Sequence, residues 1–160
     1  MKRHESLHTL TSHHQHVLTD AKRLRDASRS DGDDERRAAA NAFLDRWRRE
    51  GRLHFREEEE LVLPTMGRFA DPRRPEITEM LMQHVLIRGR VDELASTLAR
   101  DEVPSPAALE GLGRILDDHV RLEEHVVFPA VEAAVPEEEL GRLKERIAEF
   151  HARLGEGTGR

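Results

Sequence analysis

The sequence predicts an all-α protein, an antiparallel up-down-up-down four-helix bundle followed by a fifth helix. Three observations predict this class. Sustained two-residue alternation is absent, the helix formers Ala, Leu, Glu and Arg dominate, and Gly and Pro gather at a few breaks along the 160 residues. These breaks define five helical segments, at about 4–29, 35–66, 75–100, 106–132 and 136–154.

The breaks carry helix start signals. Gly32 lies between the first two segments, and Pro75 opens the third. Ser105 is placed as an N-cap, with Pro106 at the first helical position. Pro136 precedes three Glu residues, which the helix dipole favours in a first turn. Long helices joined by such short breaks are typical of bundles.

Residues spaced alternately by three and four form one apolar stripe on each of the first four segments, the pattern by which bundle helices pack. The stripes run over Leu7–Leu24, Ala40–Leu61, Ile77–Leu98 and Leu109–Val126. The fifth segment carries its own stripe, Leu140–Leu154. We expect this helix to lie against the outside or one end of the bundle, or to form a dimer interface.

Composition excludes several classes of function. A net charge of -6, with basic residues scattered among acidic ones, argues against nucleic-acid binding. The absence of Cys excludes disulfide scaffolds and thiolate metal sites. No apolar run reaches the ~20 residues that cross a membrane, and the N-terminus lacks the apolar stretch of a signal peptide. We expect one cytoplasmic domain over residues 1–160, a monomer or homodimer without membrane or nucleic-acid partners.

Six polar residues occupy stripe positions that otherwise hold almost only apolar side chains. They are His14, His54, Glu58, His84, His119 and Glu123. Burying a carboxylate without a partner is very costly, and burying an imidazole with a free nitrogen costs a few kcal/mol. Six such side chains in one core layer predict a bound cation as their common partner.

Two segments repeat each other around these residues. The run His54–Pro64 aligns with His119–Pro129, with the His, two Glu, a Val and the Pro recurring at a constant offset. A His and a Glu four residues apart lie on one helical face and reach the same inward point. His14 and His84 take comparable places in the alternate helices, so the sequence has the form of two half-sites.

Six ligands exceed the four of a tetrahedral zinc ion. Divided over two ions, the set gives two imidazoles to each, with Glu58 and Glu123 as bridges and a shared oxide or hydroxide as fifth ligand. An open sixth position can bind a small exogenous molecule. Mixed imidazole and carboxylate ligation suits iron, with zinc and manganese as competitors. We expect two iron ions, Fe2+ or Fe3+, with a bridging oxo or hydroxo group, about 3.5–4 Å apart.

With this doubled motif, the chain resembles the hemerythrin-like, His-His-Glu cation-binding domain family over residues 4–132. The resemblance implies a four-helix bundle with a non-heme di-iron centre that binds dioxygen, nitric oxide or iron. The oxygen-carrying hemerythrins of invertebrates have a further His where this chain has Arg88, and their last motif ends in Asp one residue after Glu123. The chain is more similar to a bacterial branch that includes proteins linked to iron–sulfur repair and nitrosative stress. Those proteins carry an N-terminal Cys region that is missing here.

The resemblance implies a protein that binds dioxygen or nitric oxide in oxygen, iron or nitrosative-stress handling. An alternative is a regulatory or iron-sensing module that the metal merely holds together. Catalysis at the open coordination position stays a third option, although binding without dedicated enzymatic turnover is favoured. A ferritin-like carboxylate centre ranks behind, because it uses Glu-x-x-His rather than His-x3-Glu.

Residues beside the motif give further expectations. Glu59 and Glu124 are either acceptors for ligand imidazole N–H groups or part of a solvated acidic face. Arg88 is either a partner of one of them or a surface residue. Gly51 lacks a side chain where the other repeat has Leu116, which leaves either a passage for a diatomic ligand or a closer helix approach. We expect the core to hold Phe43, Trp47, Phe55 and Phe128 and the surface to hold His13 and His16. His4, His8, His125 and His151 are either surface residues or residues paired with another side chain.

Overall fold

The computed structural model describes residues 3–157, and the side chains of residues 3–154. These residues form helices and connecting turns and no strand, which confirms the all-helical prediction. The α-helices are α1 (His8–Ser28), α2 (Asp33–Arg46), α3 (Arg52–Glu57), α4 (Leu63–Met66), α5 (Pro75–Ala99), α6 (Pro106–Leu122), α7 (Phe128–Ala134) and α8 (Glu137–Gly157). They are joined by a 3₁₀ turn and three π-helical turns: η1 (Glu5–Leu7), η2 (Trp47–Gly51), η3 (Glu58–Val62) and η4 (Glu123–Val127).

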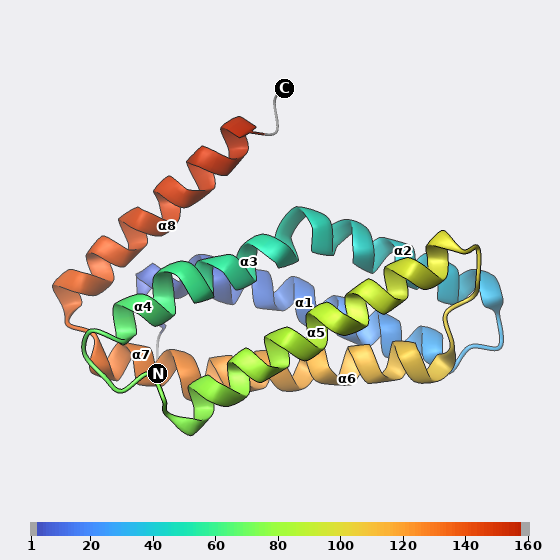
Figure 1. The fold of residues 1–160 in the computed structure, drawn as a ribbon, viewed down its shortest axis with the longest axis horizontal. Coiled ribbons are helices and arrows are strands. Elements are labelled where there is room, and N and C mark those ends of the chain that lie inside the picture. Colours follow the sequence, from blue (N-terminus) through green and yellow to red (C-terminus); the bar gives the residue numbers. More distant parts are fainter. Residues whose placement is uncertain (1–2, 158–160) are drawn as a thin grey trace.

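Four long helical segments lie lengthwise beside one another (Figure 1). They consist of α1, then α2 to α4 through the two π turns, then α5, then α6 continued into α7. The connections that follow α1 and α5 lie at one end of the molecule, and those that follow α4 and α7 lie at the other (Figure 1). The start signals act as expected, since the Ser105 hydroxyl accepts the Ala108 N–H at 3.2 Å and Pro106 begins α6.

The core consists of two apolar clusters with a polar layer between them. On α1, Leu10 belongs to one cluster and Ala21 to the other, and buried His14 lies between them. On α5, Met80 and Ile87 likewise flank His84. The polar stripe residues therefore lie at one level along the molecule, as the sequence predicts.

Two of the π turns precede a proline. Pro64 and Pro129 have no backbone N–H, and their rings crowd the carbonyl four residues back, so a regular α-helix cannot pass through them. In each case the residue before the proline closes the wider turn, by donating its N–H to the backbone oxygen of Glu58 or Glu123. The proline of each repeat thus accounts for a widened turn at the predicted bridging residue. Such turns are frequent at functional sites.

The π turn η4 also corrects the predicted stripe. Val126 is 43% exposed, whereas the next residue, Val127, is fully buried. A π turn holds more residues per turn than an α-helix, so the helix face advances by one residue there. Three-four spacing assumes an unbroken α-helix and for that reason is wrong at Val126.

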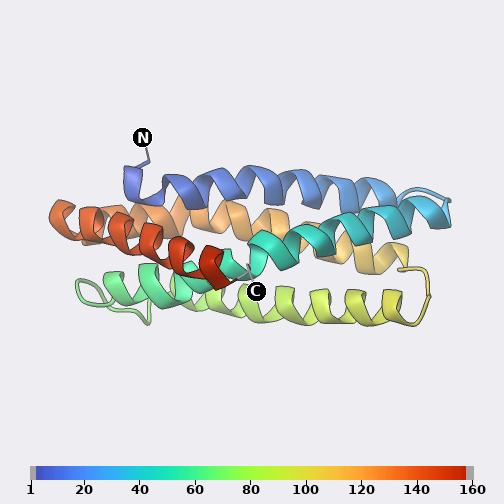
Figure 2. The ribbon, with the colours of Figure 1, turned by 90° about the horizontal axis from the view of Figure 1, so that it is seen from above.

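The fifth helix, α8, packs against one end of the bundle (Figure 2). Its stripe residues Leu140, Leu143, Ile147 and Phe150 are buried in the same apolar cluster as Leu7. This confirms a position against the bundle and leaves the stripe covered within the chain instead of free to form a dimer interface. None of the helices within residues 3–157 combines the length and apolarity needed to span a membrane.

Candidate metal centre

The structure brings all six predicted ligands together in the polar layer. His14 comes from α1, His54 and Glu58 from the α3–η3 segment, His84 from α5, and His119 and Glu123 from the α6–η4 segment. Each of the six residues is at most 2% exposed. The imidazoles and carboxylates are therefore removed from water and face one another.

The six side chains form two groups of metal-ligand atoms that share both carboxylates. One group holds the ligand atoms of His14 and His54, the other holds those of His84 and His119, and Glu58 and Glu123 belong to both. Within each group the ligand atoms lie within 4.8 Å of one another.

Each carboxylate places one oxygen beside each histidine pair. Glu58 Oε1 lies 3.1 Å from His54 Nε2, and its Oε2 lies 3.3 Å from His84 Nε2. Glu123 Oε2 lies 3.0 Å from His14 Nε2, and its Oε1 lies 3.1 Å from His119 Nε2. This placement suits carboxylates that span two cations, because each cation would receive two nitrogens and two oxygens.

The donor atoms in the layer are short of hydrogen bonds. Neither oxygen of Glu58 or Glu123, nor Nε2 of His84 or His119, has a hydrogen-bond partner among the described residues. Buried carboxylates without partners cost several kcal/mol each, unless a charge compensates them. Two divalent ions at these atoms would supply that charge, so the residues fit the group that their pattern predicts.

The pKa values of His14 and His84 also reflect the negative charge of the neighbouring carboxylates. Burial lowers the pKa of His14, but the adjacent carboxylates of Glu123 and Glu124 outweigh it and raise this pKa to about 10. Burial likewise lowers the pKa of His84, yet Glu123 and Glu58 raise it to about 10. Without a metal, these imidazoles hold protons because two buried carboxylates lie beside them.

The pKa values of two further residues of the layer, Glu58 and His119, are lowered. Burial raises the pKa of Glu58, but His54 and His84 overcome this effect and hold it well below the usual range of a carboxyl. Burial lowers the pKa of His119 to about 4, which leaves that imidazole neutral. A neutral imidazole and ionised carboxylates are the forms that bind metal.

A family model, the hemerythrin HHE cation binding domain, matches residues 5–131. The chain belongs to this hemerythrin family. Among curated proteins and among solved structures, nothing matches the chain. Membership implies cation binding and agrees with the His and Glu groups of the polar layer.

Three of the four histidines predicted to bind metal are held by an acceptor on another helical segment. His14 Nδ1 lies 2.6 Å from Glu124 Oε1, and His84 Nδ1 lies 2.7 Å from Glu59 Oε1. His119 Nδ1 lies 3.1 Å from the side-chain oxygen of Gln83. Such contacts fix the tautomer, so that Nε2 is free to bind a metal.

Arginines anchor the two outer carboxylates. Arg88 contacts Glu59 at 2.9 Å, and Arg3 contacts Glu124 at 2.8 Å. Of the alternatives drawn from the sequence, these contacts support an accepting role for the two Glu residues and a paired role for Arg88. Sequence reasoning missed Arg3 and Gln83, because nothing in the chain marks a residue of one helix as facing a histidine of another.

Aromatic rings cover two of the histidines. The Phe55 ring stacks on His84 with ring centroids 3.7 Å apart, and the Phe128 ring stacks on His14 at 5.4 Å. Both phenylalanines are buried in the core, as expected. They keep water from the imidazole faces.

His54 differs from the other three histidines. Its Nδ1 is buried and has no hydrogen-bond partner among the described residues. His13, expected at the surface, is instead half-buried, with its ring centroid 5.6 Å from that of His54. It lies beside the stripe of α1, where α3 and α8 cover it in part. His16 is exposed, as expected.

A small cavity of about 30 Å³ reaches His54 and His119. Its lining includes Gly51 and the indole of Trp47. A Cβ at Gly51 would lie 2.4 Å from Trp47 Cε3, so the glycine allows the indole to lie close to the backbone. The predicted space is present beside Gly51, but the indole of Trp47 takes up part of it.

Proposed function

We propose that this protein binds two iron ions in an antiparallel four-helix bundle and uses them to bind a small exogenous ligand such as dioxygen or nitric oxide. One ion would be held by His14 and His54 and the other by His84 and His119. Glu58 and Glu123 would bridge them. Zinc or manganese would compete for the same nitrogen and oxygen donors.

One observation carries the proposal: each buried carboxylate has one oxygen beside each histidine pair. Four protein donors per ion leave coordination positions unfilled, and iron at such positions supplies reversible redox binding of small molecules. A site built only to hold the helices together needs no unfilled position. The donor arrangement therefore favours ligand binding over a purely structural cation.

The chain's own residues supply orientation and a dry environment. Glu124 and Glu59 hold His14 and His84 in one tautomer. The rings of Phe55 and Phe128 cover the same imidazoles. Exclusion of water strengthens every charge interaction in the layer and protects a reduced centre from side reactions.

The cavity beside Gly51 supports access for a small molecule. At about 30 Å³ it has room for a ligand of two or three atoms. Its lining includes His14 and His54 of one pair and His119 of the other. We infer a role in oxygen, iron or nitrosative-stress handling, in the cytoplasm and as a monomer or homodimer.

Metal content and the optical spectrum of protein purified without oxygen test the proposal. We expect close to two iron ions per chain, and a near-ultraviolet absorption of the oxidised centre that changes with dioxygen, nitric oxide or a reductant. A colourless protein with tightly held zinc would contradict ligand binding. It would favour the alternative, a metal-stabilised regulatory or iron-sensing module.

A further inference from the structure

A second cluster of metal-ligand side chains lies next to the centre, on the side of α8. We call it the outer cluster, and it consists of His13 from α1, Glu57 from α3 and His151 from α8. His151 Nε2 contacts Glu57 Oε1. Ligand atoms of His13 and Glu57 lie within 4.8 Å of each other and of His54.

The carboxylate of Glu57 is fully buried, and one basic side chain lies beside it. The side chain is 0% exposed, and neither oxygen accepts a hydrogen bond of regular geometry among the described residues. Among these residues His151 is the one basic side chain within 4 Å of the carboxylate.

The two histidines have nitrogens that no other polar group satisfies. His13 Nδ1 is buried without a hydrogen-bond partner among the described residues, and His151 Nε2 has only its contact with Glu57. The rings of His13 and His151 have centroids 6.3 Å apart, and the Glu57 carboxylate contacts His151 and has a ligand atom within 4.8 Å of one of His13. Two nitrogens on either side of one carboxylate form a donor set for a divalent cation.

The fold itself does not require a carboxylate at this position. In the aligned repeat, the residue that matches Glu57 is Leu122, which packs against the apolar core. His151 lies beyond residues 5–131, the range of the family match. Neither residue is therefore explained by helix packing or by the metal-binding pattern of the domain.

We propose that the outer cluster binds a third divalent cation, held by His13, Glu57 and His151. Two imidazoles and one carboxylate suit borderline ions such as Zn2+, Co2+ or Fe2+. Since His151 is 33% exposed, water can complete the coordination and the ion can exchange with solvent. The cation would join α8 to α1 and α3. His54 stays a ligand of the di-metal centre, and the proposal needs no redox activity there.

Titration of the metal-free full-length protein with Co2+, followed by gel filtration and elemental analysis, tests the proposal. We expect three Co2+ per chain in the wild type and two in both His151→Ala and Glu57→Leu. The second variant gives the first repeat the leucine of the second, so core packing is retained. His16→Ala, which removes an exposed histidine of α1, is the matched control and should keep three.

Two results would overturn the proposal: a wild type that binds only two Co2+, or a His151→Ala variant that still binds three. Circular dichroism shows whether each variant folds, and if Glu57→Leu does not, His151→Ala decides alone. Glu58→Ala separates this proposal from the proposed function. Loss of metal in that variant reports on the di-metal centre, whereas the Co2+ lost with His151 reports on the outer cluster.

Discussion

In the first repeat, Gly51 and buried Glu57 flank His54, whose Nδ1 has no hydrogen-bond partner among the described residues. In the second repeat, Leu116 and Leu122 take the matching positions beside His119, and Gln83 holds the imidazole. The local backbone is the same in both, since Glu58 and Glu123 each begin a π turn that is followed by a proline. The repeated backbone thus positions the His and Glu side chains, whereas the residues that differ between the repeats determine what surrounds each histidine.

The two repeats share a buried Glu, Glu58 or Glu123. Loss of either carboxylate should have the largest effect on metal content and on stability. Glu58→Ala and Glu123→Ala each remove one donor from both ions, so we expect both variants to lose most of their metal. Loss of a ligand held at 1,000 times its dissociation constant removes about 4 kcal/mol from the free energy of unfolding. Elemental analysis and thermal unfolding measure the two effects.

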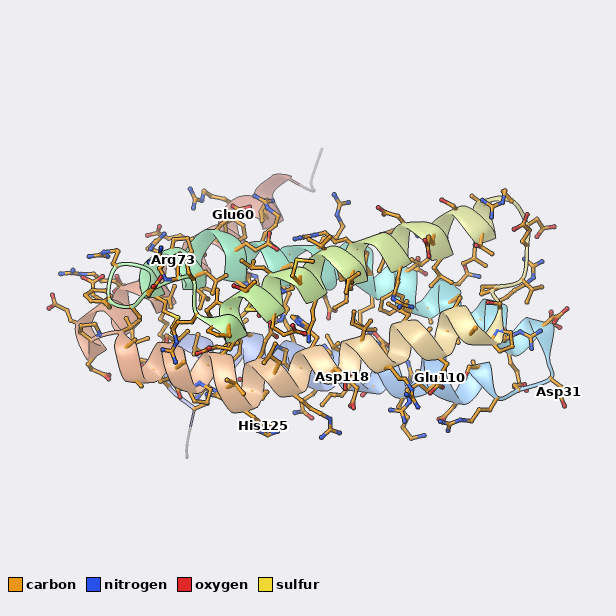
Figure 3. All side chains as sticks on the ribbon, turned by 60° about the horizontal axis from the view of Figure 1, so that its bottom comes forward. Asp31, Glu60, Arg73, Glu110, Asp118 and His125 are labelled. Carbon is orange, nitrogen blue, oxygen red and sulfur yellow. The ribbon has the colours of Figure 1, made fainter. Side chains whose placement is uncertain are left out.

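Glu60 provides the control for these variants. It is exposed and points away from the bundle (Figure 3), and it pairs with Arg56. Glu60→Ala should keep full metal content. Full occupancy in Glu58→Ala would show that the carboxylates do not bridge.

Removal of Glu124 or Glu59, the carboxylates that accept from His14 and His84, should have the next largest effect on metal binding. Glu124→Ala and Glu59→Ala leave the Nδ1–H of His14 and His84 without an acceptor, which should weaken metal binding about 10–100-fold. Competition with a chelator of known affinity measures the change. His54 has no such acceptor among the described residues, so its side chain contributes only its metal-facing nitrogen. Unchanged affinity in both variants would show that the outer carboxylates are merely surface charges. His125→Ala, at an exposed position on the outer face of η4 (Figure 3), is a neutral control.

The pH dependence of stability should differ between metal-free and metal-loaded protein. In the metal-free protein, His14 and His84 have pKa values raised to about 10, above the ~6.5 of an unfolded histidine. The stability that they contribute is complete below about pH 6.5 and is lost as the pH rises through 10. With metal bound at Nε2, the imidazoles are neutral and keep only the Nδ1 proton, so this loss should disappear. Thermal unfolding of both forms from pH 6.5 to 10 measures it, and parallel profiles would contradict the assignment.

Filling the cavity beside Gly51, where the other repeat has Leu116, should have the smallest effect, a change in the rate of ligand binding. Val17 lines the cavity, so Val17→Phe should slow the association of nitric oxide several-fold at unchanged metal content. Stopped-flow absorbance measures the rate. Val126→Phe, at an exposed position outside the cavity lining, serves as control. An equal rate in Val17→Phe and wild type would place the access route elsewhere.

The helical class and the convergence of six polar side chains could be predicted, because apolar spacing fixes which face of each helix is inward. His14 and His84 lie at one level along the bundle because each lies between apolar residues that follow the same three-four spacing. The side chains that accept a hydrogen bond from these imidazoles could not be predicted, because the rotation of one helix against another decides which carboxylate lies beside which imidazole. Glu124 therefore stayed ambiguous, and Gln83 was missed.

Other differences have local causes. Val126 was placed inward because periodicity assumes a constant number of residues per turn, which the proline-linked π turn changes. The sequence predicts His13 at the surface because this residue lies beside the stripe of its own helix, and it leaves His151 as either a surface or a pairing residue. Only the angle at which α8 crosses the bundle brings His151 to Glu57. The presence of α8 could be predicted, but its crossing angle depends on tertiary packing.

Each π turn amounts to a single-residue insertion within an otherwise continuous helix. Removal of one codon from η4, for instance that of exposed Val126, would let Val127 take the next inward place of a regular α-helix without moving the rest of the apolar stripe. A π turn of this kind can therefore arise from a regular α-helical turn, or revert to one, by the insertion or deletion of one amino acid. Between homologous chains, a one-residue gap at this point of an alignment would mark a domain in which this turn is regular α-helix.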